Sequence, residues 1–179
     1  MNLINRLTGE QALEVLRRLV AREEVFSEAV GKVAKELLSD VDMEDVAGDV
    51  FWELDIINVQ ECWDLANSDY DGYTSPEEAA AMLVEEALQE FVDQINRYHK
   101  LGMAMQEQLY CMGVVLGAYR YDQDSESEFK DWCVDIPLEY AAGILGDWRK
   151  RTTDKAAISA VNDMIKLHCP KWAKYLIRD

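Results

Sequence analysis

The feature that most constrains this chain is a long acidic stretch that contains no basic residue. Residues 36–96 hold 18 Asp and Glu side chains and no Lys or Arg, and the whole chain of 179 residues has a net charge of −17. Because no cation within the stretch neutralises it, its folded surface must face water, a bound metal ion, a basic partner or a basic segment from elsewhere in the chain. Such a surface repels a phosphate backbone, which makes nucleic acid a poor direct partner.

Size and composition predict one helical domain spanning residues 1–179. Hydrophobic residues make up 49% of the chain, which is typical of a folded globule and too high for a disordered acidic tail. No run of about 18 apolar residues occurs, so we expect no membrane-spanning helix and no membrane partner. The first residues lack the apolar core and cleavage site of a signal peptide, and a cytoplasmic protein is therefore expected.

The charge is unevenly distributed between the two ends of the chain. Residues 1–148 contain 10 basic and 32 acidic side chains, a sum of −22, and form an acidic body. Residues 149–179 contain 8 basic and 3 acidic side chains, a sum of +5. We expect these basic C-terminal helices to dock onto the acidic body.

Apolar residues recur at helical spacing along nearly the whole chain, and no convincing strand pattern occurs. The pattern predicts an all-α fold of about seven or eight helices, either a compact orthogonal bundle or a short stack of antiparallel helical hairpins. The expected long helices are residues 8–20, 25–37, 44–66, 76–100, 105–119, 138–150 and 153–167.

Two features within these helices predict how they pack. Residues 44–66 are apolar on two faces, which indicates a central element sandwiched between layers, and a break near Asp55 is compatible with the pattern. Gly113 and Gly117 lie one turn apart inside a helix, where each costs about 1 kcal/mol relative to Ala. We expect a neighbouring helix to approach closely there; the alternative is a hinge.

No pattern of catalytic residues is found, so we expect a protein that is not an enzyme. Cys62, Cys111, Cys133 and Cys169 are far apart and form no Cys-x-x-Cys pair, which is typical of small buried side chains rather than disulfides. The two histidines, His99 and His168, have no zinc-type spacing, and we expect His99 to interact with helix-terminal carbonyls. An enzyme with an unrecognised carboxylate site is the alternative.

The acidic loop at residues 67–78 has the ligand spacing of a twelve-residue calcium loop. Its candidate ligands are Asn67, Asp69, Asp71, Tyr73, Ser75 and Glu78, and Gly72 stands at the turn position. The region 58–88 therefore resembles an EF-hand, which implies a Ca²⁺ site. It departs from that family in having Asn at position 1 and Thr74 at position 8, and in lacking a second loop. The alternative is a polar turn followed by a well-capped helix, with Ser75, Pro76 and Glu78 at its start.

A second resemblance rests on several short runs. They are Tyr73-x-x-Pro76-x-Glu78-Ala79, the run from Leu109 to Arg120, Asp131-Trp132 and Asp135-x-Pro137. Together they resemble an all-helical, helical-repeat-like region of uncharacterised bacterial and archaeal proteins, some of which carry a SWIM-type zinc finger. The likeness covers residues 40–150, and the Cys and His residues of that finger are absent. It implies an interaction module with no catalytic residue to carry over.

These observations lead to one functional hypothesis and two alternatives. The leading hypothesis is a non-enzymatic helical scaffold that binds a basic protein partner through an acidic face. The first alternative is a calcium-binding protein with one EF-hand-like loop. The second is a nucleic-acid-mimicking inhibitor, whose carboxylates take the place of phosphates on a basic protein.

If the loop binds calcium, titration with Ca²⁺ should change the fluorescence of Trp63, which lies four residues before Asn67, and raise the melting temperature. The variant Glu78→Gln should respond less, because it removes the closing bidentate ligand. An unchanged melting temperature at millimolar Ca²⁺, or an equal response in the variant, would rule out the site.

Overall fold

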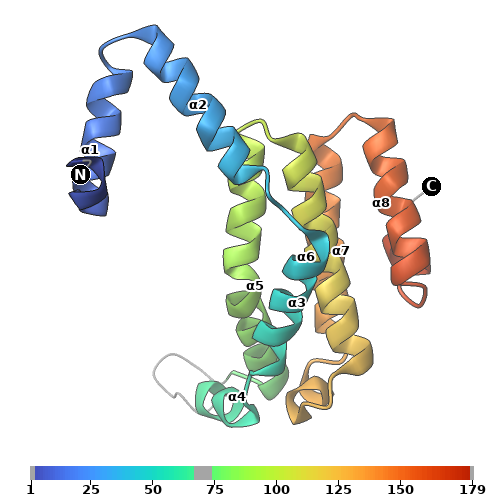
Figure 1. The fold of residues 1–179 in the computed structure, drawn as a ribbon. Coiled ribbons are helices and arrows are strands. Elements are labelled where there is room, and N and C mark those ends of the chain that lie inside the picture. Colours follow the sequence, from blue (N-terminus) through green and yellow to red (C-terminus); the bar gives the residue numbers. More distant parts are fainter. Residues whose placement is uncertain (1–2, 67–73, 178–179) are drawn as a thin grey trace. The chain divides into compact units, whose positions relative to one another are not determined.

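The structure is a computed structural model that describes residues 3–66 and 74–177, and in these residues it is all-α (Figure 1). The all-α prediction is confirmed, and no strand occurs in the described ranges. The helices are η1 (Leu3–Arg6), α1 (Gly9–Val20), α2 (Glu24–Leu38), α3 (Met43–Asp55), α4 (Val59–Ala66), α5 (Pro76–Lys100), α6 (Ala104–Asp124), η2 (Glu128–Trp132), α7 (Ile136–Arg151), α8 (Lys155–His168) and α9 (Ala173–Leu176), where η denotes a 3₁₀-helix.

The chain divides into two compact units, which is a finer division than the single domain expected from the sequence. Unit 1 comprises residues 1–40 and unit 2 comprises residues 41–179. In unit 1, α1 and α2 contact each other, and neither helix contains a buried residue. The hydrophobic core lies in unit 2.

The helix starts follow local capping chemistry. At α1, Thr8 and Gln11 form a reciprocal capping box, and at α5 Ser75 and Glu78 do the same, with Pro76 in the first turn. The Asp42 side chain accepts hydrogen bonds from two backbone N–H groups at the start of α3. The start of α5 matches the well-capped helix that Ser75, Pro76 and Glu78 indicated in the sequence.

The central helix of unit 2 is α6, which contacts α3, α5, α7 and α8. Every residue from Gly113 to Tyr119 is buried, as expected for a helix that is covered on all sides. Residues 44–66 form two helices, and the break after Asp55 is confirmed. The prediction that this segment is sandwiched was wrong, because its second apolar face is exposed: Trp52 is 62% and Trp63 42% accessible.

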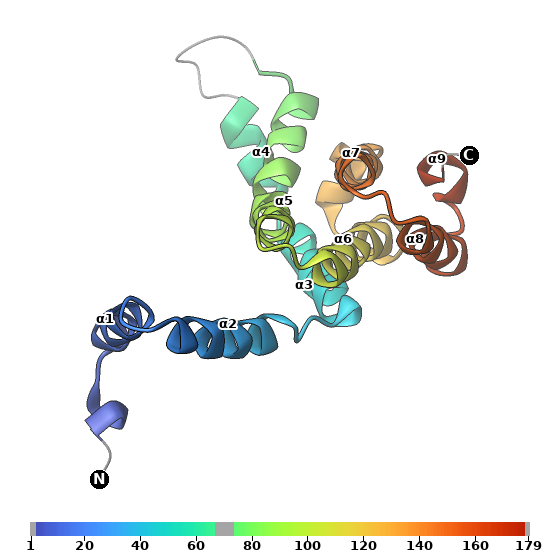
Figure 2. The same cartoon turned by 90° about the horizontal axis from the view of Figure 1, so that it is seen from above.

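The long helices of unit 2 alternate in direction. In Figure 1, α5, α6 and α7 run side by side, and Figure 2 views α5 to α8 nearly along their axes. The arrangement therefore matches the antiparallel hairpins rather than the orthogonal bundle that the sequence left as alternatives.

The C-terminal helices pack onto α6 mainly through apolar contacts. The sequence had led us to expect that the attraction between the basic segment 149–179 and the acidic body would hold them there. Val161, Ile165 and Leu176 are buried. The Trp172 ring meets Tyr119 edge-on at 5.3 Å, and its Nε1 donates to Asp122 at 3.1 Å. One ion pair from this segment to the body joins Arg151 and Glu107 at 3.7 Å.

Gly113 and Gly117 allow α3 to lie directly against α6. A Cβ atom on Gly113 would lie 2.6 Å from Cβ of Val46, and one on Gly117 would lie 2.5 Å from the backbone oxygen of Ala47. The predicted close approach of a neighbouring helix is thus confirmed, and its partner is α3.

Replacement of Gly117 by Ala should therefore lower the free energy of unfolding by about 1–3 kcal/mol, because a backbone carbonyl cannot move aside as a side chain can. Gly143→Ala is the matched control, since a Cβ at this position in α7 meets nothing within 4 Å. It should stabilise the protein by up to about 1 kcal/mol through helix propensity. Urea unfolding of both variants measures the difference, and equal effects would contradict the close approach.

Candidate functional site

An acidic groove lies between α3 and α5, with α6 contributing to its wall. Its volume is about 400 Å³. The lining residues are Asp49, Trp52, Glu53, Glu90, Phe91, Gln94 and Tyr110. It brings together three carboxylates and an exposed indole from parts of the chain that are distant in sequence.

Helix geometry places these side chains on the rim. Asp49, Trp52 and Glu53 share one face of α3 because they are three and four residues apart, and this exposed face adjoins the buried face of Val46 and Val50. On α5, Glu90 and Gln94 are one turn apart. Because both apolar faces of the segment 44–66 were expected to be covered, the sequence did not predict this groove. The spacing of residues 49, 52 and 53 is the signal that could have indicated it.

The carboxylates of the groove are not neutralised within the described part of the chain. None of the ion pairs there involves Asp49, Glu53 or Glu90. In the cation-free stretch 36–96, Glu44 pairs with Arg120 at 2.7 Å, but both side chains are partly exposed and such a pair contributes at most about 1 kcal/mol.

The pKa of Tyr110, at the wall of the groove, is affected by the nearby carboxylates. Its pKa is raised above the ordinary value, mainly by burial and further by Tyr98, Asp49 and Glu90. The phenol is therefore held neutral and can still donate a hydrogen bond to a ligand.

The arrangement suits an organic cation better than a metal ion. Within residues 3–66 and 74–177, no group of three or more His, Cys, Asp or Glu side chains is placed to hold a metal. A guanidinium or ammonium group needs less convergence, because it can contact separate carboxylates and stack on an aromatic face. Trp52, 62% exposed, offers such a face beside Asp49 and Glu53.

The predicted calcium ligands fall mostly outside the described residues. Asn67, Asp69, Asp71 and Tyr73 belong to that part of the chain, so the calcium site stays a prediction. Of the remaining two, Ser75 Oγ accepts from the Glu78 backbone N–H at 3.2 Å, and Glu78 Oε2 accepts from the Ser75 N–H at 2.9 Å. The Glu78 carboxylate thus has a capping role, as the alternative interpretation of this loop expected.

A second polar cluster joins the ends of α5, α6 and α7. Nδ1 of His99 lies 3.2 Å from Oε2 of the buried Glu107, and Arg151 lies 3.7 Å from Oε1 of the same carboxylate. The expectation that His99 binds helix-terminal carbonyls was therefore wrong, because the turn after α5 brings its ring onto α6. We interpret the cluster as a clamp between three helix ends.

The four cysteines are free thiols and are all buried, which confirms the prediction from their spacing. Burial raises the pKa of Cys111 and Cys169 to about 12 and that of Cys133 to about 11. Thiols in this state are poor nucleophiles, because little thiolate is present at neutral pH. They do not provide a reactive site.

Comparison with family models, with curated proteins and with solved structures found no match to this chain. The resemblance to a SWIM-associated helical region therefore stays a prediction. None of the described helices has the length and apolar character needed to cross a membrane. What the structure defines is an all-α protein with an acidic groove on its larger unit.

The cysteine burial predicts the thiol reactivity of the folded protein. At pH 8, a disulfide reagent that releases a coloured thiol should modify none of the four cysteines rapidly, and all four after unfolding in guanidinium. As the pH is raised toward 11, the rate of modification should increase in proportion to the fraction of each thiol that is ionised. Rapid modification of one cysteine in the native protein would contradict the packing around it.

Proposed function

We propose that this protein is a non-enzymatic helical interaction module that binds a basic segment of a protein partner in the acidic groove. The observation that supports the proposal most directly is the grouping of Asp49, Glu53 and Glu90, which have no ion-pair partner in the described residues, around the exposed Trp52. A cytoplasmic location and a protein partner belong to the same proposal.

The groove supplies both attraction and selectivity. Uncompensated negative charge raises the encounter rate with basic partners and disfavours acidic ones. Binding a cation would also relieve repulsion among the three carboxylates. The indole of Trp52 contributes through a cation–π contact, which is worth about 0.5–2 kcal/mol depending on desolvation.

Arginine suits this groove better than lysine. Its planar guanidinium can pair with a carboxylate through two hydrogen bonds and can stack on Trp52 at the same time. Lysine offers a point charge with a strongly hydrated ammonium group. The expected partner segment therefore contains arginine. If the protein instead mimics nucleic acid, the arginine-containing segment would belong to a nucleic-acid-binding protein.

A synthetic arginine-rich decapeptide tests the proposal by calorimetric titration at low salt. Binding should weaken as salt is added, and Glu53→Lys should weaken it about tenfold or more, since a loss of 1.4 kcal/mol changes affinity tenfold. Trp52→Ala should weaken it as well, through loss of the aromatic face.

Glu126→Lys is the matched control for the peptide experiment. Glu126 is exposed in the α6–η2 connection and does not line the groove, yet the substitution changes the net charge by the same amount. It should leave the affinity nearly unchanged. Equal losses in both variants would indicate general charge attraction, and absence of binding at low salt would contradict the proposal outright.

A further inference from the structure

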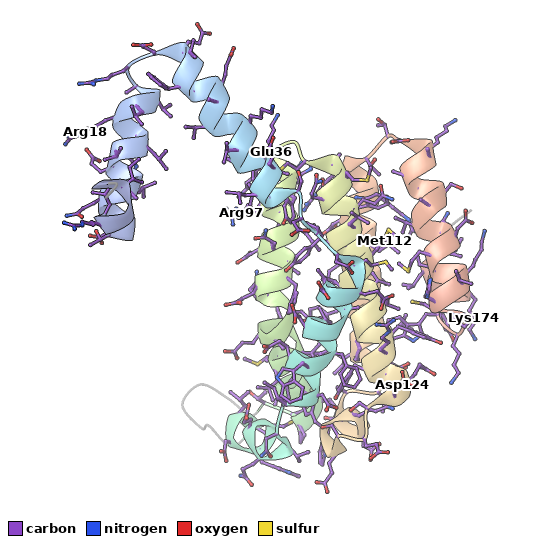
Figure 3. All side chains as sticks on the ribbon, viewed as in Figure 1. Arg18, Glu36, Arg97, Met112, Asp124 and Lys174 are labelled. Atoms are coloured by element: carbon purple, nitrogen blue, oxygen red, sulfur yellow. The ribbon has the colours of Figure 1, made fainter. Side chains whose placement is uncertain are left out.

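The helices of unit 1 expose an unusual amount of apolar surface. Neither α1 nor α2 contains a buried residue. Figure 3 shows their side chains, with Arg18 labelled on α1. The large exposed hydrophobic residues are Leu13, Val15, Leu16, Val25, Phe26, Val33 and Leu37, of which Val25 and Leu37 are 69% and 76% accessible. Apolar exposure this dense marks an interaction surface.

The apolar residues of α2 have the spacing of a helix-packing seam. Phe26, Val30, Val33 and Leu37 follow one another at intervals of four, three and four residues, which is the spacing of the core positions of a coiled coil. On α1, Leu13, Leu16 and Val20 follow at intervals of three and four. Both helices therefore present stripes that suit packing against further helices.

The net charge of unit 1 permits association with its own copy. Residues 1–40 contain 6 basic and 7 acidic side chains, a sum of −1, whereas residues 41–179 contain 12 and 28, a sum of −16. Two copies of unit 1 thus have little net repulsion. A strongly basic or strongly acidic partner would gain little electrostatic attraction from a unit whose net charge is close to zero.

The order of the charges favours an antiparallel arrangement of the copies. The first half of α2 carries Glu24 and Glu28, and the second half carries Lys32 and Lys35, with Glu36 as the exception. In α1, Glu10 and Glu14 likewise precede Arg17 and Arg18. When such a helix lies antiparallel to its own copy, each acidic half lies beside a basic half, whereas a parallel arrangement places like charges together.

We propose that unit 1 associates with unit 1 of a second copy, with α2 antiparallel to α2, and forms a four-helix bundle. A two-fold interface of this kind is self-complementary, as the charge order requires. It would also provide the core that α1 and α2 lack, because units of about 40 residues usually need an additional partner to be stable.

The molar mass of the full chain in solution tests the proposal. At micromolar concentration, light scattering coupled to size exclusion should give twice the 20.5 kDa chain mass. The double variant Val33→Glu, Leu37→Glu should give a monomer, because it places four carboxylates in the seam of the dimer. A monomeric wild-type protein would overturn the proposal.

The control is the double variant Met82→Glu, Leu167→Glu in unit 2. It makes the same change in charge at side chains of nearly equal exposure, 53% and 75% compared with 54% and 76% for Val33 and Leu37. It should remain a dimer. Dimers in both variants would show that the seam of α2 is not the interface, and monomers in both would show that added charge alone separates the copies.

Cross-linking tests the arrangement without disrupting the seam. Val30→Cys lies near the midpoint of α2 and should be linked to its copy by a short bis-maleimide, while the four native cysteines are buried. Leu37→Cys should not be linked, because antiparallel pairing about the midpoint of α2 separates the two copies of this position by about 18 Å along the axis at 1.5 Å per residue. Efficient linkage at position 37 together with position 30 would indicate a parallel pair and overturn the proposed arrangement.

Discussion

The close packing of α3 against α6 is the contact on which the architecture of unit 2 depends. Gly113 and Gly117 remove two side chains from α6, and the backbone of α3 occupies the space. Because Val46, Ala47 and Val50 then face α6, helical geometry turns Asp49, Trp52 and Glu53 outward. The acidic rim of the groove thus follows from the packing of the adjoining face of the same helix.

The electrostatic character of the protein follows from where its cations are placed. Basic residues gather in the C-terminal segment, yet that segment joins the body mainly through buried apolar side chains such as Ile165 and Leu176, while Lys150 and Lys166 pair with nearby carboxylates on their own helices. The charges of Asp49, Glu53 and Glu90 therefore have no ion-pair partner among the described residues. This separation of apolar docking from charge leaves the groove negatively charged, and the proposed binding of a basic segment rests on that charge.

The two units differ in the way their apolar residues are used. Unit 2 buries its apolar residues in a core around α6, and its surface carries nearly all of the net negative charge. Unit 1 has apolar stripes of the same helical spacing but too few residues to enclose them. The acidic groove and the apolar seam are thus suited to chemically different partners, the first to a basic segment and the second to a copy of the same helices.

The sequence by itself determined the secondary structure, because helical periodicity and capping are local. The spacing of apolar residues, the capping boxes at Thr8 and Ser75, and the break after Asp55 all depend on side chains within a few residues of one another. Even the close helix approach could be inferred, since a glycine pair inside a helix is costly without a packing reason.

Only the tertiary structure decided which apolar faces are covered and which charges meet. Trp52 and Trp63 have the spacing of buried residues but are exposed, because α6 rather than the segment 44–66 occupies the centre. The groove joins Asp49 to Glu90, and the clamp joins His99 to Glu107 and Arg151, through contacts between separate helices. Periodicity tells which side of a helix is apolar, but the identity of the neighbour depends on how all the helices share one core.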